Sequence, residues 1–433
     1  MPSVCYDVVV VGGGPAGLAA ACSAMEAGAS SVVIVERDAE LGGILRQCVH
    51  TGFGLRIFRE DLTGPEYAER WIERVRELGV EQRTGAFALS LNADGRVKVV
   101  SATRGVEEIR GKAIVLAMGC REKTRGALAI PGTRPSGVWT AGTAQRLINV
   151  EGYLPGRRIV IAGSGDVGLI MARRLHLEGA EVQGVIEIAP FPGGLMRNVV
   201  QCLEDYRIPL LLSHAITEIG GRRRVEWVKV AGVGPDLRPA RQLERVIECD
   251  TVLLSVGLIP ENELSREAGI AIDPKTGGAV VTQYMETSLP GVFACGNVVH
   301  VNDLVDNVSD EAIVAGREAA AFACRRSARV GRWIDVKGGD RVRSVVPQRV
   351  SSAGVNTVTL DLRVTEVIDH AVVEVATNDR VLATHKRRRV RPGEMVRIPL
   401  AASHIDSVPF ECGSIRVSVA HSRAQGGPVG SGN

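Results

Sequence analysis

The sequence predicts an α/β protein with two similar strand–helix–strand domains, followed by a small antiparallel β domain. A long segment recurs at a constant offset of 151 residues, so that Gly12 corresponds to Gly163. Each copy is followed further along the chain by another apolar strand that ends in glycine, as parallel sheets require at their ligand-binding edge. From about Val345 apolar and polar residues alternate, which is typical of antiparallel strands.

The repeat runs from Tyr6 to Glu36 and again from Arg157 to Glu187. Each copy contains an apolar run rich in β-branched residues, a GxGxxG turn, a helix, a second apolar run and a final glutamate. The turn glycines are Gly12, Gly14 and Gly17 in the first copy and Gly163, Gly165 and Gly168 in the second. The sequence therefore predicts two Rossmann-like dinucleotide-binding domains.

The motif has a physical explanation. The first glycine permits the tight turn, the second lets backbone N–H groups approach a pyrophosphate, and the third lets helix and strand pack closely. The helix N-terminus adds partial positive charge, and the glutamate can accept hydrogen bonds from ribose hydroxyls. A single GxGxxG is weak evidence, and two turns that bind nothing are the alternative. The duplication, with the acid at the same spacing, favours binding.

The order of the elements predicts an interrupted first domain. The closing strands are Ala113–Gly119 and Thr251–Gly257; the segment Thr287–Asn297 and a helix from about Ser309 to Arg325 then return the chain to the first domain. Within the first domain we expect a helix over Pro65–Leu78, capped by Thr63, and a hairpin over Phe87–Val100. The expected parts are residues 1–150 and 258–330 (first domain), 151–257 (second domain), 340–422 (β domain) and 423–433 (disordered tail).

Composition excludes several classes of function. The net charge of +3 and the 4% aromatic content argue against a nucleic-acid partner. None of the nine cysteines forms a CxxC pair, so we expect no metal site and reduced thiols in a cytoplasmic protein. The apolar stretch 8–25 is interrupted by glycines and Pro15, and we expect no transmembrane segment. The basic run Lys386–Arg391 is interpreted as a solvated hairpin rather than a site for anionic lipid or nucleic acid.

Residues 5 to 325 resemble flavoproteins of the pyridine nucleotide–disulfide oxidoreductase type, through the two motifs, the closing strands and the PGVFACGN segment. The resemblance implies an NAD domain inserted in an FAD domain. The implied FAD contacts are Gly12, Gly14, Pro15, Ala16, Gly17, Glu36, Arg37, Gly43, Gly119, Gly296 and Asn297. The implied NAD contacts are Gly163, Gly165, Asp166, Val167, Gly168, Glu187 and Gly257. Asn297 stands where the family usually has an aspartate, so the ribityl contact there loses its charge.

Further segments resemble a branch of this family that lacks the disulfide. They are Leu41–Gly54, Leu62–Arg70, Gly119–Pro135, Gly163–Leu175, Phe191–Asp205 and His300–Ala312. They look like the FAD/NAD-binding oxidoreductase that accompanies flavin-dependent glycerol-3-phosphate dehydrogenase. They are more distantly similar to the alpha subunits of opine and proline dehydrogenases and of hydrogen cyanide synthase. The resemblance implies two partners, namely a second flavoprotein dehydrogenase subunit, together with a small cysteine-rich subunit. Peripheral membrane association through these partners is an open alternative.

Two departures disfavour disulfide reduction. Only Cys48 follows the Gly42–Gly43 turn, where the disulfide reductases have two cysteines, and the β domain has no counterpart of their C-terminal His–Glu dyad. No catalytic residue is certain. Cys48 and His50 are candidates, as a flavin-facing thiol and a proton donor. A buried thiol and a hydrogen-bonded loop histidine are the favoured interpretation, because cysteine is so often buried. His300 is expected to be structural.

Glu187 predicts a preference for NAD over NADP, because its charge would repel a 2′-phosphate; Arg173 and Arg174 could soften that preference. The expected function is hydride transfer between nicotinamide C4 and flavin N5 in an electron-transfer subunit of a glycerol-3-phosphate, amino-acid or opine dehydrogenase. The N-terminus of the helix near Ser309 is expected to stabilise negative charge on reduced flavin. A stand-alone NADH oxidase or reductase and a scaffold subunit with structural FAD are the alternatives.

Overall fold

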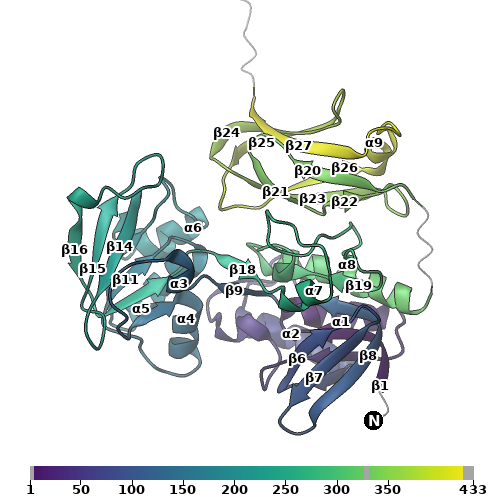
Figure 1. The fold of residues 1–433 in the computed structure, drawn as a ribbon, viewed down its shortest axis with the longest axis horizontal. Helices are drawn as coiled ribbons and strands as arrows, with labels where there is room; N and C mark the ends of the chain where they lie inside the picture. The colour runs from purple at the N-terminus through teal and green to yellow at the C-terminus, as the bar shows by residue number, and fades with distance from the viewer. Residues whose placement is uncertain (1–3, 326–330, 423–433) are drawn as a thin grey trace, which may run out of the picture.

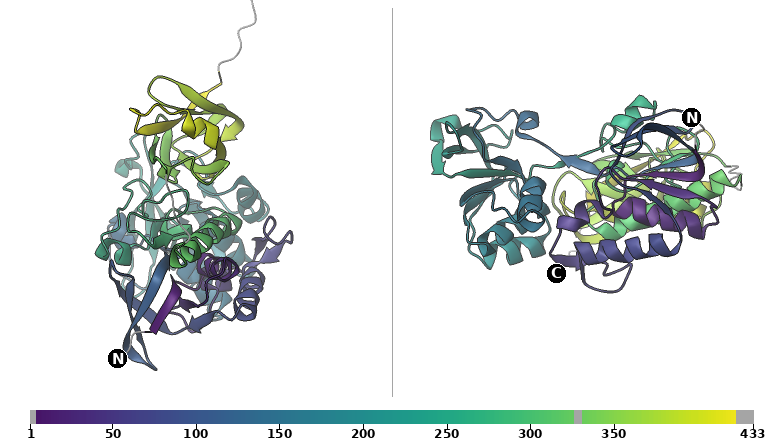
Figure 2. Two further views of the ribbon diagram at one scale, coloured as in Figure 1. Left: turned by 90° about the vertical axis from the view of Figure 1, so that its right-hand side faces the viewer. Right: turned by 90° about the horizontal axis from the view of Figure 1, so that it is seen from below.

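The computed structural model describes residues 4–325 and 331–422, which form three domains. Figure 1 shows the first domain at the lower right, the second domain at the left, and the β domain above the first. The right-hand view in Figure 2 shows the second domain to one side of the first, with a narrow connection running between them. The expected α/β architecture with a C-terminal β domain is confirmed.

The first domain is built on a mainly parallel sheet. Its central strand β1 (Val4–Val11) lies between β2 (Val32–Val35) and β8 (Gly105–Leu116), and both pairings are parallel. The remaining strands are β5 (Glu81–Arg83), β6 (Ala86–Leu91), β7 (Arg96–Ser101) and β19 (Val292–Ala294). Helices α1 (Pro15–Glu26) and α8 (Val305–Ala323) pack on each other and on this sheet, which explains why β1 is an almost unbroken apolar run.

The second domain has a fully parallel sheet in the order β10-β17-β11-β12-β13. Its strands are β10 (Val138–Thr140), β11 (Arg158–Ala162), β12 (Glu181–Ile186), β13 (Leu210–Leu211) and β17 (Thr251–Leu254). Helices α4 (Ala141–Asn149) and α5 (Asp166–Leu177) share one core with Ile159 and Ile161. The antiparallel strands β14 (His214–Gly220), β15 (Trp227–Gly232) and β16 (Arg245–Glu248) cover the other face, against Val160 and Ala162.

The chain crosses between these two domains through one antiparallel pair of short strands. β9 (Cys120–Glu122) pairs with β18 (Leu258–Pro260), with Glu122 opposite Leu258. This crossing corrects the expected boundary at residues 150 and 151. β10 and α4 belong to the second domain, because β10 pairs with β17 and α4 packs into that core. The first domain therefore breaks at β9.

The β domain is a sandwich of two antiparallel-rich sheets, ordered β22-β20-β27-β24-β25 and β21-β23-β26. Its strands are β20 (Ile334–Gly338), β21 (Val342–Val346), β22 (Arg349–Val350), β23 (Thr357–Val364), β24 (Ile368–Ala376), β25 (Val381–Val390), β26 (Val396–Ala401) and β27 (Ser414–His421). It begins at Ile334 rather than at residue 340, because β20 pairs with β27, the last strand of the domain. The basic run from Lys386 lies mainly on edge strand β25, and the expected tail 423–433 lies outside the described residues.

The structure contains the capped helix and the hairpin that the sequence predicts in the first domain. α2 (Gly64–Glu77) begins after Thr63, whose side chain forms a reciprocal capping box with Glu66. β6 and β7 form the expected hairpin. α8 begins at Val305, one turn earlier than expected, because Leu304 is the last extended residue before it. Within the described part of the chain, no helix has both the length and the apolar character needed to cross a membrane.

Candidate dinucleotide sites and a buried charge cluster

The first glycine-rich turn connects β1 to α1 and combines two kinds of glycine. A Cβ on Gly12 would lie 2.5 Å from the carbonyl oxygen of Ala117, and one on Gly17 would lie 1.8 Å from the carbonyl oxygen of Gly12. Packing within the chain therefore requires both glycines. A Cβ on Gly14 would meet only the Cα of Gly43, at 3.9 Å. No residue that the structure describes excludes a side chain at Gly14, so the space there fits the close backbone approach of a pyrophosphate.

The second turn repeats this arrangement between β11 and α5. A Cβ on Gly163 would lie 2.1 Å from the carbonyl oxygen of Ser255, and one on Gly168 would lie 2.6 Å from the Cβ of Ser255. The middle glycine, Gly165, has its nearest neighbour at 3.3 Å, the hydroxyl of Ser255. The middle glycine is again the least constrained by the chain, although less clearly than Gly14.

The two glutamates at the strand ends make equivalent hydrogen bonds. Glu36 accepts from the N–H groups of Gly13 at 2.6 Å and Asp38 at 2.8 Å. Glu187 accepts from the N–H of Ser164 at 2.8 Å and that of Ala189 at 2.9 Å. These donors occupy equivalent repeat positions, so the internal repeat holds in the hydrogen bonding as well as in the sequence. Both carboxylates are buried, and each holds its glycine-rich turn in place.

Residues flanking the glycines serve the protein's own packing. Asp166 accepts from the N–H of Leu195 at 2.8 Å and from the amide of Asn198 at 2.7 Å, and so anchors the loop after β12. Pro15 is the first residue of α1, and Ala16 is buried. Val167 is in the first turn of α5 and packs against the core of the second domain. The nucleotide contacts of these residues stay predictions.

The other expected contacts lie at the carboxyl ends of the parallel strands. Gly119 follows β8 with φ +73°, and Gly257 follows β17 with φ +102°. Gly43 begins the 3₁₀ turn η1 (Gly43–Gln47) beside Gly14, where a Cβ would lie 2.9 Å from the Cα of Gly14. Arg37 is exposed directly after Glu36. The expected residues therefore gather at the ligand edge of each sheet.

Asn297 lies in the short turn η4 (Gly296–Val298) after β19. Its side-chain oxygen Oδ1 accepts from the N–H of Asn302 at 2.9 Å, and its side-chain nitrogen Nδ2 lies 3.6 Å from the Cys120 sulfur. Burial raises the pKa of Cys120 to about 11, so this thiol is protonated. The side chain that replaces the family's aspartate thus fixes the loop and the crossing strand β9.

Cys48 does not have the surroundings of a reactive thiolate. Its thiol donates to the carbonyl of Ile44 at 3.3 Å and lies 3.9 Å from Gln145 Oε1. Burial raises its pKa to about 12, which keeps it protonated at neutral pH. All nine cysteines lie within the described residues, and each is free.

His50 lies close to both domains. Its Nδ1 lies 3.0 Å from the carbonyl of Thr51, and its ring is 5.0 Å from that of Phe53. Burial lowers the pKa of His50, with the Thr51 contact opposing the shift, so the imidazole is neutral at pH 7. Nearby, a Cβ on Gly52 would lie 3.3 Å from the guanidinium of Arg197, which belongs to the second domain. The favoured structural interpretation of both candidates fits these surroundings.

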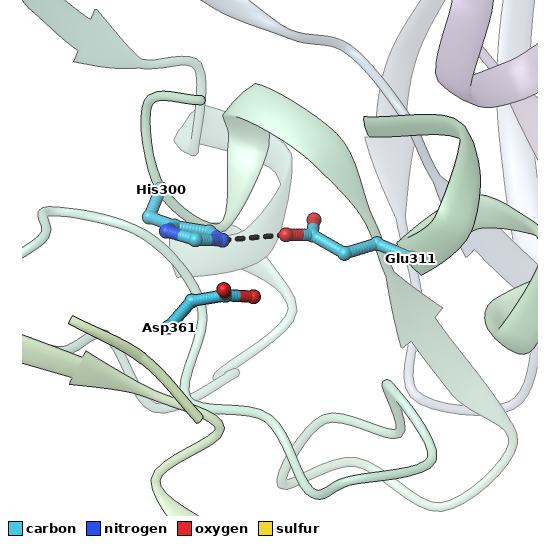
Figure 3. Close-up of side chains that lie close together, drawn as sticks. All are labelled: His300, Glu311 and Asp361. Carbon is cyan, nitrogen blue, oxygen red and sulfur yellow. Dashed lines mark hydrogen bonds and ion pairs between the residues drawn. The ribbon is translucent and has the colours of Figure 1, made fainter. Parts of the chain in front are cut away.

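Sequence reasoning missed a buried cluster of charges. His300 Nε2 lies 2.6 Å from Glu311 Oε1, and Asp361 from β23 completes the group (Figure 3). All three side chains are buried. The sequence singles out only His300, because its partners lie on α8 and in another domain, and no local spacing marks them.

Contacts also join the second domain to its neighbours. Gln47 donates to the carbonyl of Gly142 at 2.8 Å, and Asn149 donates to the carbonyl of Gln47 at 2.8 Å. The turn between β25 and β26 reaches the second domain, where a Cβ on Gly393 would lie 2.3 Å from the carbonyl oxygen of Gly193. The second domain is therefore held by the η1 loop and by the β domain, besides the β9–β18 crossing.

Residues 6–319 match the family model described as pyridine nucleotide-disulphide oxidoreductase. The chain belongs to this family. The assignment agrees with the duplicated turns and makes the protein an FAD-dependent oxidoreductase of the pyridine-nucleotide type. Its members bind FAD and NAD(P), and the residues at both turns fit such ligands.

Among curated relatives of this oxidoreductase is an opine oxidase subunit from Agrobacterium tumefaciens (strain Ach5), 30% identical over 75% of the chain. That match spans 64% of the relative's length, less than two thirds. The hydrogen cyanide synthase subunit HcnB of Pseudomonas protegens is 26% identical over 72% of the chain and 69% of its own length. Both relatives are named as subunits of larger enzymes.

Solved structures show the same fold. Thioredoxin reductase of T. acidophilum superposes with a TM-score of 0.61 at 24% identity, covering 75% of this chain and 99% of that one. L-proline dehydrogenase from P. horikoshii superposes with a TM-score of 0.51 at 21% identity, covering 72% and 55%. These similarities concern the fold.

Proposed function

We propose that this oxidoreductase binds FAD at the turn after β1 and NAD(H) at the turn after β11. The observation that carries the proposal is the pair of equivalent sites. Each has a middle glycine that the chain constrains less than the other two, and each has a buried glutamate fixed by equivalent backbone donors. Glu187 supports NAD over NADP, because a buried carboxylate at this strand end would repel a 2′-phosphate.

The two cofactors, when bound, supply hydride transfer between nicotinamide C4 and flavin N5. The chain binds and orients them. Backbone N–H groups at the starts of α1 and α5 would donate to the pyrophosphates, and each helix end adds partial positive charge. The η4 turn would bind the ribityl chain, and the N-terminus of α8 would stabilise negative charge on the reduced ring.

Thiol chemistry has no evident place in this mechanism. Cys48 is protonated, and His50 is neutral at pH 7. A protonated thiol is a poor nucleophile. Electrons delivered to the flavin would therefore leave the chain directly from the flavin.

We propose further that the chain is the electron-transfer subunit of a multi-component dehydrogenase of the glycerol-3-phosphate, amino-acid or opine type. Two relatives named as enzyme subunits support this proposal, as does the lack of a cysteine pair that could carry electrons onward. The proposed partners are a second flavoprotein subunit, together with a small cysteine-rich subunit. Any approach to a membrane would be peripheral, through them.

The test is anaerobic reduction of the purified chain. Flavin bleaching by NADH, faster than by NADPH, is expected. Absence of bleaching would favour a scaffold with structural FAD. Rapid turnover with oxygen and no partner would favour a stand-alone oxidase. Co-expression with genomic neighbours should then give substrate-dependent NAD reduction that the isolated chain lacks, and full substrate oxidation by the chain alone would refute the subunit role.

A further inference from the structure

We propose that His300, Glu311 and Asp361 form a positioning cluster through which the β domain holds the Gly296–Asn297 turn. The inference rests on the proposed FAD site, because that turn is expected to contact the ribityl chain. It assigns the β domain a part in cofactor binding, in addition to any role in docking partners. The three side chains converge from the loop after η4, from α8 and from β23 (Figure 3).

Glu311 links the turn to the histidine. One carboxylate oxygen accepts from the N–H of Gly296 at 2.9 Å, and the other contacts His300 Nε2 at 2.6 Å. Asn302 adds a donor at 3.3 Å. Because Glu311 is buried, water cannot replace these partners. The carboxylate therefore fixes the position of the Gly296 backbone relative to α8.

The β domain reaches the same loop through two arginines. Arg363 from β23 donates to the carbonyl of Val301 at 3.0 Å and forms an ion pair with Asp303. The N–H of Met395 donates to Asp303 at 2.6 Å. Arg397 from β26 donates to Asn307 at 2.7 Å in the first turn of α8. The loop between η4 and α8 is thus tied to the β domain along its length.

Asp361 connects these contacts to the histidine. Its Oδ1 lies 2.8 Å from Arg397 Nε, an ion pair without hydrogen-bond geometry. Burial pulls the pKa of His300 down, but the charge and hydrogen bond of Glu311, with the charge of Asp361, raise it overall. Asp361 therefore favours the protonated histidine, which in turn holds Glu311. Arg397 pairs with Asp361, so one acid of the cluster already has a cationic partner.

The same first turn of α8 also holds the loop that follows Gly54. The backbone N–H of Arg56 donates to the carboxylate of Asp306 at 2.9 Å. The guanidinium of Arg56 forms an ion pair with Asp310 at 2.6 Å. Arg397 also contacts Asp310, at 3.3 Å. Movement of the β domain would therefore be transmitted to two loops at the proposed flavin site.

The experiment compares FAD release from the holoenzyme and from two β-domain variants, Asp361→Asn and Arg363→Met. We expect each variant to release FAD roughly tenfold faster, the effect of weakening one charged hydrogen bond, and to shift the flavin's visible spectrum. Asp361→Asn removes a buried charge, so its resistance to unfolding should not fall. Weaker flavin retention without lower stability is a result that a purely structural role would not give. Asp369→Asn is the matched control, because Asp369 pairs with Arg389 on the exposed part of the same domain.

Two variants of the linking carboxylate complete the test. Glu311→Gln keeps an acceptor for the N–H of Gly296 and should retain FAD better than Glu311→Ala. If the folded Asp361→Asn and Arg363→Met proteins have wild-type flavin spectra and FAD release rates, the positioning role is refuted and the proposed function still stands. A wild type that binds no flavin would overturn the proposed function as well. One equivalent of divalent metal, lost on Asp361→Asn substitution, would replace the positioning role with a metal site.

Discussion

Gly14 and Gly17 are the same residue type under two different constraints. A methyl group on Gly17 would overlap the backbone of Gly12, whereas one on Gly14 would have 3.9 Å of clearance inside the protein. Gly17→Ala should therefore destabilise the fold, and Gly14→Ala should fold normally but bind FAD at least roughly tenfold more weakly. Thermal unfolding of the flavin-free proteins and flavin titration separate the two effects. A Gly14→Ala protein with full FAD affinity would contradict the pyrophosphate assignment.

Glu187 should determine the choice of nicotinamide nucleotide. Glu187→Gln keeps an acceptor oxygen for Ser164 and removes the charge, so the ratio of NADH to NADPH reduction rates should fall by roughly tenfold. Stopped-flow bleaching of the flavin measures the ratio. Glu36→Gln is the equivalent change in the first repeat and should alter FAD binding while leaving coenzyme preference unchanged. A wild type that prefers NADPH would refute the assignment.

Cys48 should take no part in electron storage. Its thiol is protonated and no cysteine partner is paired with it, so reductive titration should consume two electrons per FAD. Cys48→Ser should retain reduction of the flavin by NADH. Uptake of four electrons in an anaerobic dithionite titration would reveal a redox disulfide.

Elements whose signals are local were predicted best. The Thr63 cap predicted α2 to within one residue, and the alternation from about Val345 predicted antiparallel strands such as β23. β20 was missed because it is only five residues long and its partner β27 is the last strand of the β domain, far along the chain. Both nucleotide turns were predictable because each is contiguous in sequence. The His300 cluster was not, since Asp361 arrives from a separate domain.

The contact between α8 and β23 should make stability depend on pH. Burial raises the pKa of Asp361 to about 6, with Arg397 opposing, and the pKa of His300 is also raised overall. A pKa above the unfolded value gives stability that is present at low pH and lost as the pH rises through the folded value. Between about pH 4 and pH 7, Asp361→Asn should therefore gain up to about 3 kcal/mol relative to wild type.

Urea unfolding at a series of pH values measures this difference directly. Subtracting the wild-type curve removes the contribution of groups with the opposite trend, such as Asp369, whose pKa is lowered by its hydrogen bond with Arg389. The Asp369→Asn protein should lack the gain. If the difference in unfolding free energy between wild type and Asp361→Asn does not vary with pH, then the Asp361 carboxylate is exposed to water and its pKa is not raised.

For the whole molecule, the order of the domains along the chain could be predicted from the sequence, but the residues at which the domains begin and end could not. The sequence repeat predicted that the second domain begins just before the second copy of the motif. The parallel pairing of β10 with β17 shows that β10, which precedes that copy, also belongs to the second domain. Pairing between strands far apart in the chain decides such edges. The family assignment does not depend on them, because it rests on the matched region 6–319.

Because the chain enters and leaves the second domain through the β9–β18 pair, we expect that this domain can be removed. Glu122 and Leu258 are directly opposite each other. The N–H of Lys123 donates to the carbonyl of Gly257 at 3.1 Å in the next pair, which is the hydrogen-bonded kind of pair that a two-residue hairpin turn closes. Replacing residues 124–256 with Asn-Gly should give a yellow protein that retains FAD, is not reduced by NADH, and is still bleached by dithionite. Flavin content and reductant response of that protein are the measurements, and a colourless or insoluble product would show that the two domains depend on each other to fold. The domain with the proposed NAD site is thus an insertion between two paired strands, β9 and β18.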